Sequence, residues 1–433
     1  MVHGATTPAS DGNDPRLGPE LILIVGGLIA TGHAAVMITI AALPSFMEQL
    51  GSVLFIGVVM SIGIALASSS FGRVITNIPA GMLSERIGRK PVIITGAVIV
   101  AIAGTLSGFS PNAPTFWAIR FVMGIGSAMT ITIANVVATD LSNVDNRGRV
   151  LGLMHGVQLV VGIFTPALGG FLAYFTDIRA PFYASGVGIA VFAVWAFARL
   201  PETRPLRDRN IGVGSDSQLS LGATSLLKDP SFLWVCILGF STFYLRNGAT
   251  TGLIPVFMDD VLGMNTAEIG ILFTVSSVIH GTIIYPAGWA SDKWGRIPII
   301  IPAGIVVGIG IALLPLMTTI VPFVIVFVIL HAAMGWGGQA PTAYLGDISP
   351  AGQRGAAFGM YRTFGDTAGI LAPLLALGMA DYVSYTSAFG FGAALWIATV
   401  LIFWRVAKES AGANRKHWRT MGTEQPAKEQ ARH

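Results

Sequence analysis

Charge is what this 433-residue sequence has least of. Asp, Glu, Lys and Arg make up 11% of the chain, against roughly 25% in soluble proteins, whereas hydrophobic residues make up 53%. So few charges cannot cover a water-exposed surface, and the composition therefore excludes a soluble globular protein, a disordered chain and a coiled coil. The one cysteine, Cys236, cannot form a disulfide within the chain.

Several chemical signatures are also missing. No Gly-x-x-x-x-Gly-Lys-Ser/Thr pattern occurs, so the sequence does not indicate direct use of ATP. No Cys/His cluster indicates a metal centre, and we expect no metal, no other cofactor and no nucleic-acid partner. Residues 1–19 are polar and lack the apolar core and small-residue cleavage site of a signal peptide, so we expect a cytoplasmic tail there.

Long hydrophobic runs are what the sequence does contain. A helix needs about 20 apolar residues to cross a bilayer core of about 30 Å. Glycine and proline are tolerated in such helices. The chain has twelve runs of this kind, which we expect at 20–43, 53–80, 91–110, 114–139, 148–175, 180–200, 231–258, 267–290, 297–316, 321–346, 354–380 and 385–406.

The positive charges give the orientation. Four of the 26 Lys and Arg residues lie well inside spans, and of the others only Arg179 lies in a loop after an odd-numbered span. The rest lie in the tails or at the even-numbered loops, which places both termini in the cytoplasm. We predict an all-α membrane protein with cytoplasmic tails at 1–19 and 407–433, six-helix bundles at 20–200 and 231–406, and a flexible cytoplasmic linker at 201–230.

The two halves repeat each other. When the chain is shifted by 207 residues, Gly81–Pro91 falls on Gly288–Pro298, and the pairs that also coincide are Asp140 with Asp347, Arg147 with Arg354, Gly162 with Gly369 and Pro166 with Pro373. One offset that holds across four helices indicates an internal duplication. Parallel repeats of this kind are typical of transporters whose halves rock about a site at the middle of the membrane.

The repeated segment carries a family resemblance. The residues from Gly81 to Lys90 resemble the Gly-x-x-x-Asp-Arg-x-Gly-Arg-Arg/Lys signature of the major facilitator superfamily, with Glu85 in the acidic position. A degenerate copy with Asp292 and Arg296 follows the eighth span. Arg120-x-x-x-Gly124-x-Gly126 resembles a motif of the fourth helix, and Gly162-x-x-x-Pro166-x-x-Gly169-Gly170 partly matches a fifth-helix motif of antiporters. The most similar subgroup is that of the twelve-helix drug:proton antiporters.

The resemblance implies a gate on the cytoplasmic side. Glu85 would dock on the N-terminus of the eleventh helix, where unpaired N–H groups and the helix dipole attract a carboxylate. Arg89 would pair with Asp140, and an alternative is that the loop only anchors the topology with positive charge. The candidate gating residues are Gly81, Glu85, Arg86, Gly88, Arg89, Asp140, Asp292 and Arg296.

Ionisable residues inside a span are costly and usually functional. The resemblance implies that helices 1, 4, 7 and 10 line a central cavity and that 3, 6, 9 and 12 face lipid. The third, sixth, ninth and twelfth spans contain no buried charge, as this arrangement requires. The candidate substrate-binding residues are Arg73, Arg246, His33, Arg120, His155, Gln158, Tyr244, His280, His331, Trp336, Gln339, Tyr361 and Arg362.

Four Arg and four His residues face one buried carboxylate, Asp366. Arg362 lies one turn from Asp366 and can pair with it. An Arg buried without a partner is expensive, so the excess predicts a substrate with a carboxylate, sulfonate or phosphate group. Arg73 and Arg246 are the first candidates, whereas Arg120 can instead be structural or serve proton coupling. Hydrogen bonds to helix carbonyls and plain packing are the alternatives for each Arg, His and aromatic residue.

These observations predict a secondary active transporter of a small organic solute, preferably an anion, in the plasma membrane (the inner membrane of a bacterium), acting by alternating access as a monomer. Asp366, His33 and His331 are the candidate proton carriers, because His and a buried Asp can titrate near neutral pH. A first alternative is a proton-coupled exporter of lipophilic drugs. A membrane-embedded hydrolase is another, although an aspartyl enzyme needs two buried carboxylates. A receptor or scaffold on the same fold is the third.

Overall fold

The computed structural model describes residues 19–53, 55–141, 147–203, 226–350 and 353–410, and this part of the chain is almost entirely helical. The first half contains α1 (Pro19–Met37), α2 (Leu43–Leu50), α3 (Val58–Ile87), α4 (Arg89–Gly108), α5 (Ala113–Asp140), α6 (Arg147–Phe175) and α7 (Ala180–Arg199). The second half begins with α10 (Pro230–Tyr244), the π-helix η2 (Leu245–Leu253), α11 (Ile254–Asp260), α12 (Thr266–Trp294) and α13 (Ile297–Leu313). It ends with η3 (Leu314–Leu316), α14 (Ile320–Gly337), α15 (Ala340–Ile348), α16 (Arg354–Tyr382) and α17 (Tyr385–Val406).

The predicted spans are found with small shifts. Eleven described segments are long and apolar enough to cross a membrane, and the remaining predicted span, the seventh, is a continuous helical stretch that η2 divides. Three expected details were wrong. The first span does not end at 43, because the helix breaks after Met37 and resumes as α2. The second extends to Ile87, and the tenth is divided between α14 and α15.

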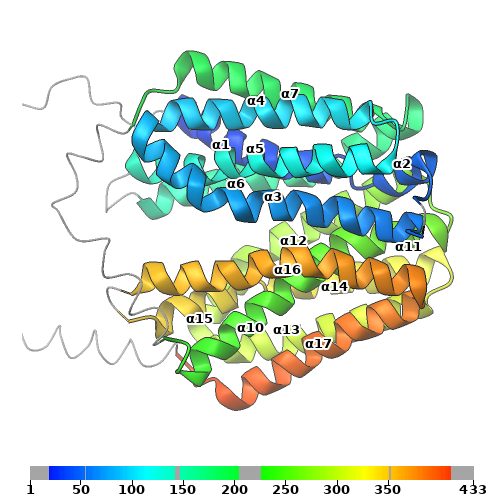
Figure 1. The fold of residues 1–433 in the computed structure, drawn as a ribbon. Coiled ribbons are helices and arrows are strands. Elements are labelled where there is room, and N and C mark those ends of the chain that lie inside the picture. Colours follow the sequence, from blue (N-terminus) through cyan, green and yellow to red (C-terminus); the bar gives the residue numbers. More distant parts are fainter. Residues whose placement is uncertain (1–18, 54, 142–146, 204–225, 351–352, 411–433) are drawn as a thin grey trace, which may run out of the picture.

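The helices form two bundles that lie side by side (Figure 1). In the first bundle α5 packs on α3 and α4, and α1 packs on α6. In the second, α16 packs on α10, and α12 packs on α14. The halves meet along two seams, α3 against α16 and α6 against α12. The α6–α12 seam depends on small residues, because a Cβ on Gly170 would overlap the backbone of Thr266.

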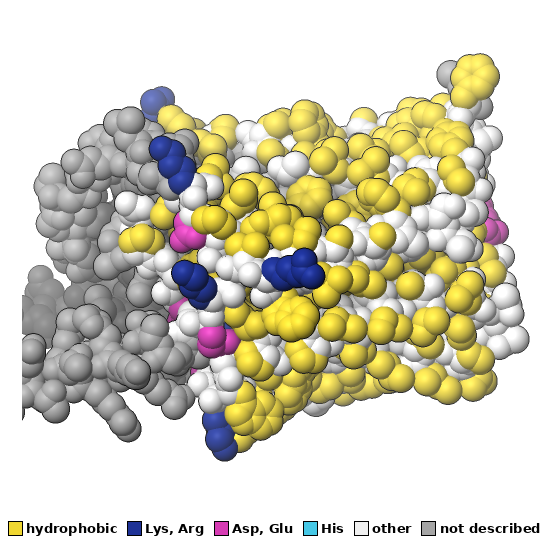
Figure 2. Space-filling model, turned by 90° about the horizontal axis from the view of Figure 1, so that it is seen from below, with side chains coloured by type: hydrophobic (Ala, Val, Ile, Leu, Met, Phe, Trp, Pro, Cys, Tyr) yellow, Lys and Arg dark blue, Asp and Glu magenta, His cyan; other side chains and the backbone are white. Residues whose placement is uncertain are grey.

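The outer surface fits a bilayer. In Figure 2, hydrophobic side chains cover most of the visible face, and most charged side chains lie toward the end from which the grey segments extend. The helix α1 begins and α17 ends at that same end (Figure 1). This is the cytoplasmic end of the twelve-helix fold that the sequence predicts.

Most hydrogen bonds between described residues of the two halves lie at the opposite, extracellular end. Ser45 of α2 donates to Asp259 of α11, at 2.9 Å. Thr266 at the start of α12 donates to the carbonyl of Gly170, at 3.2 Å. The extracellular part of α3 is largely buried, whereas Ile78, Met82 and Ile87 near its cytoplasmic end are exposed. The two halves are therefore held together on the extracellular side in this structure.

Candidate functional site

The π-helix η2 lies in the middle of the seventh span and carries Arg246. Short π-helical stretches are rare and often occur at functional sites. Its wider turn is visible in a hydrogen bond from the Thr251 hydroxyl to the Arg246 carbonyl five residues earlier, at 2.9 Å. The Arg246 side chain is exposed although it belongs to a residue at mid-span. No hydrogen-bond acceptor for its guanidinium is found among the described residues.

Basic groups from four elements gather around Arg246. Arg246 interacts electrostatically with Arg362 of α16, with Arg73 of α3 and with His33 of α1. Arg73 is also within electrostatic range of Asp366. These residues come from both halves of the chain, so the structure brings together at the centre most of the basic groups that we ranked first. We call Arg73, Arg246, Arg362, Asp366 and His33 the central cluster.

Two of the three arginines in the central cluster have partners inside the protein. Arg73 donates a hydrogen bond to the hydroxyl of Ser70 at 2.9 Å. Ser70 lies at the α3–α16 seam, 3.4 Å from where a Cβ of Gly369 would be. Arg362 forms the expected ion pair with Asp366, at 3.3 Å. Only one of the three arginines is therefore neutralised by a carboxylate of the cluster.

Arg362 faces the interior and not the lipid. Arg362 is within electrostatic range of Arg73 and Arg246, whereas Leu371 and Leu375 are exposed farther along α16. Arg362 precedes Leu371 by nine residues, which places it about 180° away around the helix. Its side chain nevertheless remains 65% exposed.

The histidines occupy different surroundings. His33 lies against Gly162 of α6, with its Nε2 3.5 Å from where a Cβ would be. His280 of α12 interacts with Arg246 and with the backbone of His331. The Nδ1 of His331 lies 2.9 Å from the carbonyl of Phe327, and its ring packs on Phe327. His331 is therefore a packed core residue, while His33 belongs to the central cluster and His280 borders it.

Arg120 does not join the central cluster. It is buried in the first half, where its guanidinium lies over the rings of Phe116 and Phe182 at 5.0 and 5.7 Å. It also donates to the hydroxyl of Thr39 at 3.3 Å, and its Nε has no partner among the described atoms. Aromatic faces stabilise a cation in such a site. The geometry favours the structural alternative for Arg120.

The aromatic candidates also lie apart. Tyr244 packs against Phe391 and Gly392 of α17, and Tyr361 packs against Gly239 of α10. Both point into the core of the second half, which makes them poor candidates for substrate contact. Gln158 is half-buried on α6, and the side chain of His155 lies outside the described residues.

Trp336 and Gln339 line a separate cavity of about 230 Å³ near the cytoplasmic end of the second half. Asp292 and Arg296 line the same cavity, which lies between α12 and the α14–α15 break. The two substrate candidates thus lie next to the second-half copy of the signature loop. They stay predictions as substrate-binding residues.

The signature loop of the first half is tied together by charge. Arg89 is fully buried and lies 3.4 Å from Asp140, the pairing that the resemblance implied. Its other contacts are with Ser84 at 2.6 Å and Glu85 at 3.9 Å. Glu202 accepts hydrogen bonds from the N–H groups of Arg89 and Lys90, at 2.8 and 3.0 Å, and so caps α4.

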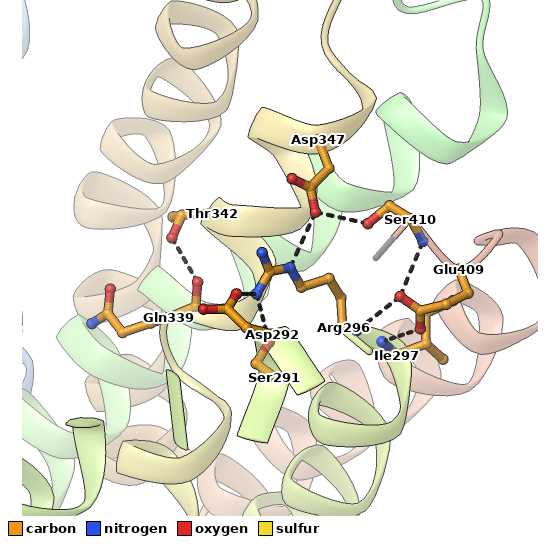
Figure 3. Close-up of polar contacts among 9 residues, drawn as sticks. All are labelled: Ser291, Asp292, Arg296, Ile297, Gln339, Thr342, Asp347, Glu409 and Ser410. Atoms are coloured by element: carbon orange, nitrogen blue, oxygen red, sulfur yellow. Dashed lines mark hydrogen bonds and ion pairs between the residues drawn. The ribbon is translucent and has the colours of Figure 1, made fainter. Parts of the chain in front are cut away.

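The second half contains an equivalent network, which is formed by Arg296, Asp347, Glu409 and Ser410 (Figure 3). Arg296 lies 3.1 Å from Asp347, and Ser410 donates to the same carboxylate at 2.9 Å. Glu409 accepts from the N–H groups of Arg296 and Ile297, at 2.8 and 2.9 Å. Burial disfavours the charge on Arg296, but hydrogen bonds and ion pairs with Asp347 and Asp292 outweigh it and raise its pKa.

Glu202, Glu409 and Ser410 were not among the candidate gating residues. The repeat could have revealed them, because the 207-residue shift also places Glu202-Thr203 on Glu409-Ser410. The docking of Glu85 on the start of α16 stays a prediction, since the side chains of residues 354–356 lie outside the described set. Arg86 is exposed at the end of α3, and a Cβ at Gly81 would meet no other atom.

Comparison with known proteins decides the family. The family model "Major Facilitator Superfamily" matches residues 23–267 and 243–430. The chain belongs to the major facilitator superfamily. It is accordingly a multi-pass protein of the inner membrane, and membership supports the expectation that it is no enzyme.

The individual proteins to which the chain is similar share between 13% and 28% sequence identity with it. The multidrug resistance protein MdtL of Citrobacter koseri is 28% identical over 212 residues, or 49% of this chain and 52% of MdtL. The chain therefore spans about half the length of the curated relatives it matches. A D-xylose-proton symporter structure has a TM-score of 0.72 at 17% identity and covers 90% of this chain and 98% of its own. The structure of a mutant of the nucleoside transporter NupG has a TM-score of 0.69 at 13% identity, covering 90% and 99%. These two structures support the fold alone.

Proposed function

We propose that this protein is a secondary transporter that exports drug-like organic molecules, and that its central cluster selects those with a negative charge. Membership in the major facilitator superfamily supports transport by alternating access. The similarity to MdtL, whose name describes multidrug resistance, supports export of drug-like molecules. The charge selectivity is argued from the cluster.

The proposal rests on the surroundings of the Arg246 side chain. Its guanidinium is exposed at mid-span, beside Arg73 and Arg362, without a hydrogen-bond acceptor among the described residues. A cation at that depth is expensive unless water or an anion accompanies it. A carboxylate, sulfonate or phosphate on the substrate can accept two parallel hydrogen bonds from Arg, which are stronger than neutral ones.

The similarity to MdtL also supports a broader second candidate, an exporter of lipophilic drugs irrespective of their charge. This alternative requires that the arginines be satisfied within the protein. Ser70 and Asp366 do this for Arg73 and Arg362. No described residue does it for Arg246, and for this reason we rank the anion-selective exporter first.

Proton coupling is part of the proposal. Asp366 is the carboxylate of the central cluster, and it forms an ion pair with Arg362 at 3.3 Å. A substrate anion that binds Arg362 would compete with Asp366 for the same guanidinium. Asp366 is therefore the residue that we propose as the proton carrier.

The test is transport of a matched pair of compounds into proteoliposomes under an imposed pH gradient. The pair is a lipophilic carboxylic acid and its uncharged primary amide, which differ in charge and little in size. We expect the wild type to transport the acid, and Arg246→Ala to lose most of that flux. Arg199→Ala is the matched control, since it removes an exposed guanidinium that pairs with Glu20 outside the cluster. Equal transport of acid and amide, unaffected by Arg246→Ala, would favour the second candidate.

A further inference from the structure

The helix α3 begins at the extracellular end without a cap of its own. Its N-cap residue is Gly57, which has no side chain to accept a hydrogen bond. The first N–H groups of any helix lack partners within the helix, and the dipole makes that end attractive to a carboxylate. A cap for α3 must therefore come from elsewhere.

The other half of the protein supplies it. Asp381, near the end of α16, accepts a hydrogen bond from the N–H of Met60 in the first turn of α3, at 3.2 Å. A Cβ on Gly57 would overlap the Asp381 carboxylate, so the glycine leaves the space that the carboxylate fills. The next residue, Tyr382, donates its hydroxyl to the carbonyl of Phe55, at 2.9 Å.

The equivalent junction in the repeat is built differently. The helix α12 is the counterpart of α3, and its N-cap Asn265 forms a capping box with Glu268. Asn265 accepts from the N–H of Glu268 at 3.0 Å, and Glu268 accepts from the N–H of Asn265 at 2.9 Å. A helix start at this level can therefore be capped within its own half. The cap on α3 instead joins the two halves.

We propose that Asp381 is the latch of the extracellular gate, and that its carboxylate caps α3 only while the two halves touch on the extracellular side. Opening the protein to the outside separates α16 from α3 and exposes the first N–H groups of α3 to water. The latch thus stabilises the state with a closed extracellular side. This inference goes beyond the proposed function and does not depend on which substrate is carried.

The size of the effect follows from capping. Replacing an Asp cap by Ala costs about 1 kcal/mol in typical helices, which is about a fivefold change in an equilibrium constant. Asp381→Ala should therefore raise the fraction of extracellularly open molecules about fivefold. Asp381→Asn keeps an acceptor and loses the charge, so it should raise that fraction by less.

The measurement is cysteine accessibility from the outside of right-side-out vesicles. Leu66 of α3 lies between the halves, 3.6 Å from where a Cβ on Gly252 would be, and Leu66→Cys serves as the reporter. Cys236→Ala removes the native cysteine, which is buried. A membrane-impermeant maleimide is added outside, and the labelling rate reports how often the extracellular side opens.

A second variant tests the latch without touching Asp381. The backbone of Gly57 has φ −69° and ψ 167°, which Ala adopts readily, and the three atoms nearest to the methyl group of Gly57→Ala all belong to the Asp381 carboxylate. We expect faster labelling in Gly57→Ala and in Asp381→Ala, and no further increase when the two are combined. Asp177→Ala is the matched control, because Asp177 bonds the N–H of Arg179 within its own extracellular loop, at 2.7 Å.

The labelling rates of these variants decide whether Asp381 acts as the latch. Unchanged labelling in both Asp381→Ala and Gly57→Ala would overturn the proposal. An equal increase in Asp177→Ala would also overturn it, since any change in extracellular charge would then suffice. Transport of anions by the wild type can fail in a separate assay without affecting either labelling result.

Discussion

The two glycines that end α3 and α12 should be far less replaceable than the glycine that opens the signature. Gly88 and Gly295 have φ of 105° and 111° with ψ of 161° and 164°, a backbone region that is essentially restricted to glycine. By contrast, a Cβ at Gly81 meets no neighbouring atom, and Gly81 is inside a helix. Gly88→Ala, Gly295→Ala and Gly81→Ala form a matched set.

The expected magnitude has two parts. Backbone strain in this region costs on the order of 1–3 kcal/mol. A Cβ at Gly88 would also come 2.5 Å from Glu202, and one at Gly295 would come 2.8 Å from Glu409, which displaces the caps of α4 and α13. Loss of a cap costs about 1 kcal/mol, so each variant should lose about 2–4 kcal/mol. Gly81→Ala should gain about 0.5–1 kcal/mol, because Ala favours the helix.

The assay is thermal unfolding of the purified protein in detergent. A loss of about 2–4 kcal/mol lowers Tm by roughly 4–16 °C for a bundle of this size. Gly88→Ala in a Glu202→Ala background should show only the backbone part, since no carboxylate remains to be displaced. A Tm for Gly81→Ala as low as that for Gly88→Ala would refute the reasoning.

Three further predictions follow from the same geometry. Arg120→Leu should leave the KM for an anionic substrate unchanged and alter Tm, because Arg120 packs on Phe116 and Phe182 outside the central cluster; a large rise in KM would contradict this. Asp366→Asn should abolish the dependence of transport on a pH gradient while exchange of substrate down its own gradient persists; retained proton coupling would remove Asp366 as the carrier. Partial burial, together with Asp259 and Asp260 of the opposite half, raises the pKa of Glu48. The pKa of Glu48 is therefore higher when the extracellular side is closed than when it is open. The closed state consequently binds more protons and is stabilised in acid. It loses that stabilisation as the pH rises through the raised pKa. External labelling of Leu66→Cys should therefore increase above pH of about 4.5, and Glu48→Gln should flatten this dependence; an unchanged profile in Glu48→Gln would assign the dependence to other groups.

The spans and the duplication could be predicted because run length and a constant offset are properties of the sequence alone. The π-helical hydrogen bonding in the seventh span could not be predicted. The residues from Arg246 to Thr251 fit an α-helix and a π-helix equally well before their packing is known. The burial of Tyr244 could not be predicted for a related reason. Tyr244 precedes Arg246 by two residues, which points it to the opposite side of the helix, toward α17.

The central cluster was partly predictable. Buried charge pointed to Arg73, Arg246, Arg362 and Asp366, and the structure brings these residues together. The same rule selected Arg120, which aromatic rings surround instead. Sequence spacing within one helix does not reveal the neighbours that other helices supply. Asp381 shows this limit most clearly, because its role as a cap depends on a helix more than 300 residues away.

The most direct test of the account is equilibrium binding of the acid and its matched amide to the purified wild type and Arg246→Ala. A hydrogen bond to a charged group contributes about 1.5–3 kcal/mol, so the acid should bind the wild type roughly 10- to 150-fold more tightly than it binds Arg246→Ala. The amide should bind both proteins about equally. If the amide, or an amine of the same size, binds the wild type as tightly as the acid does, the central cluster does not select anions.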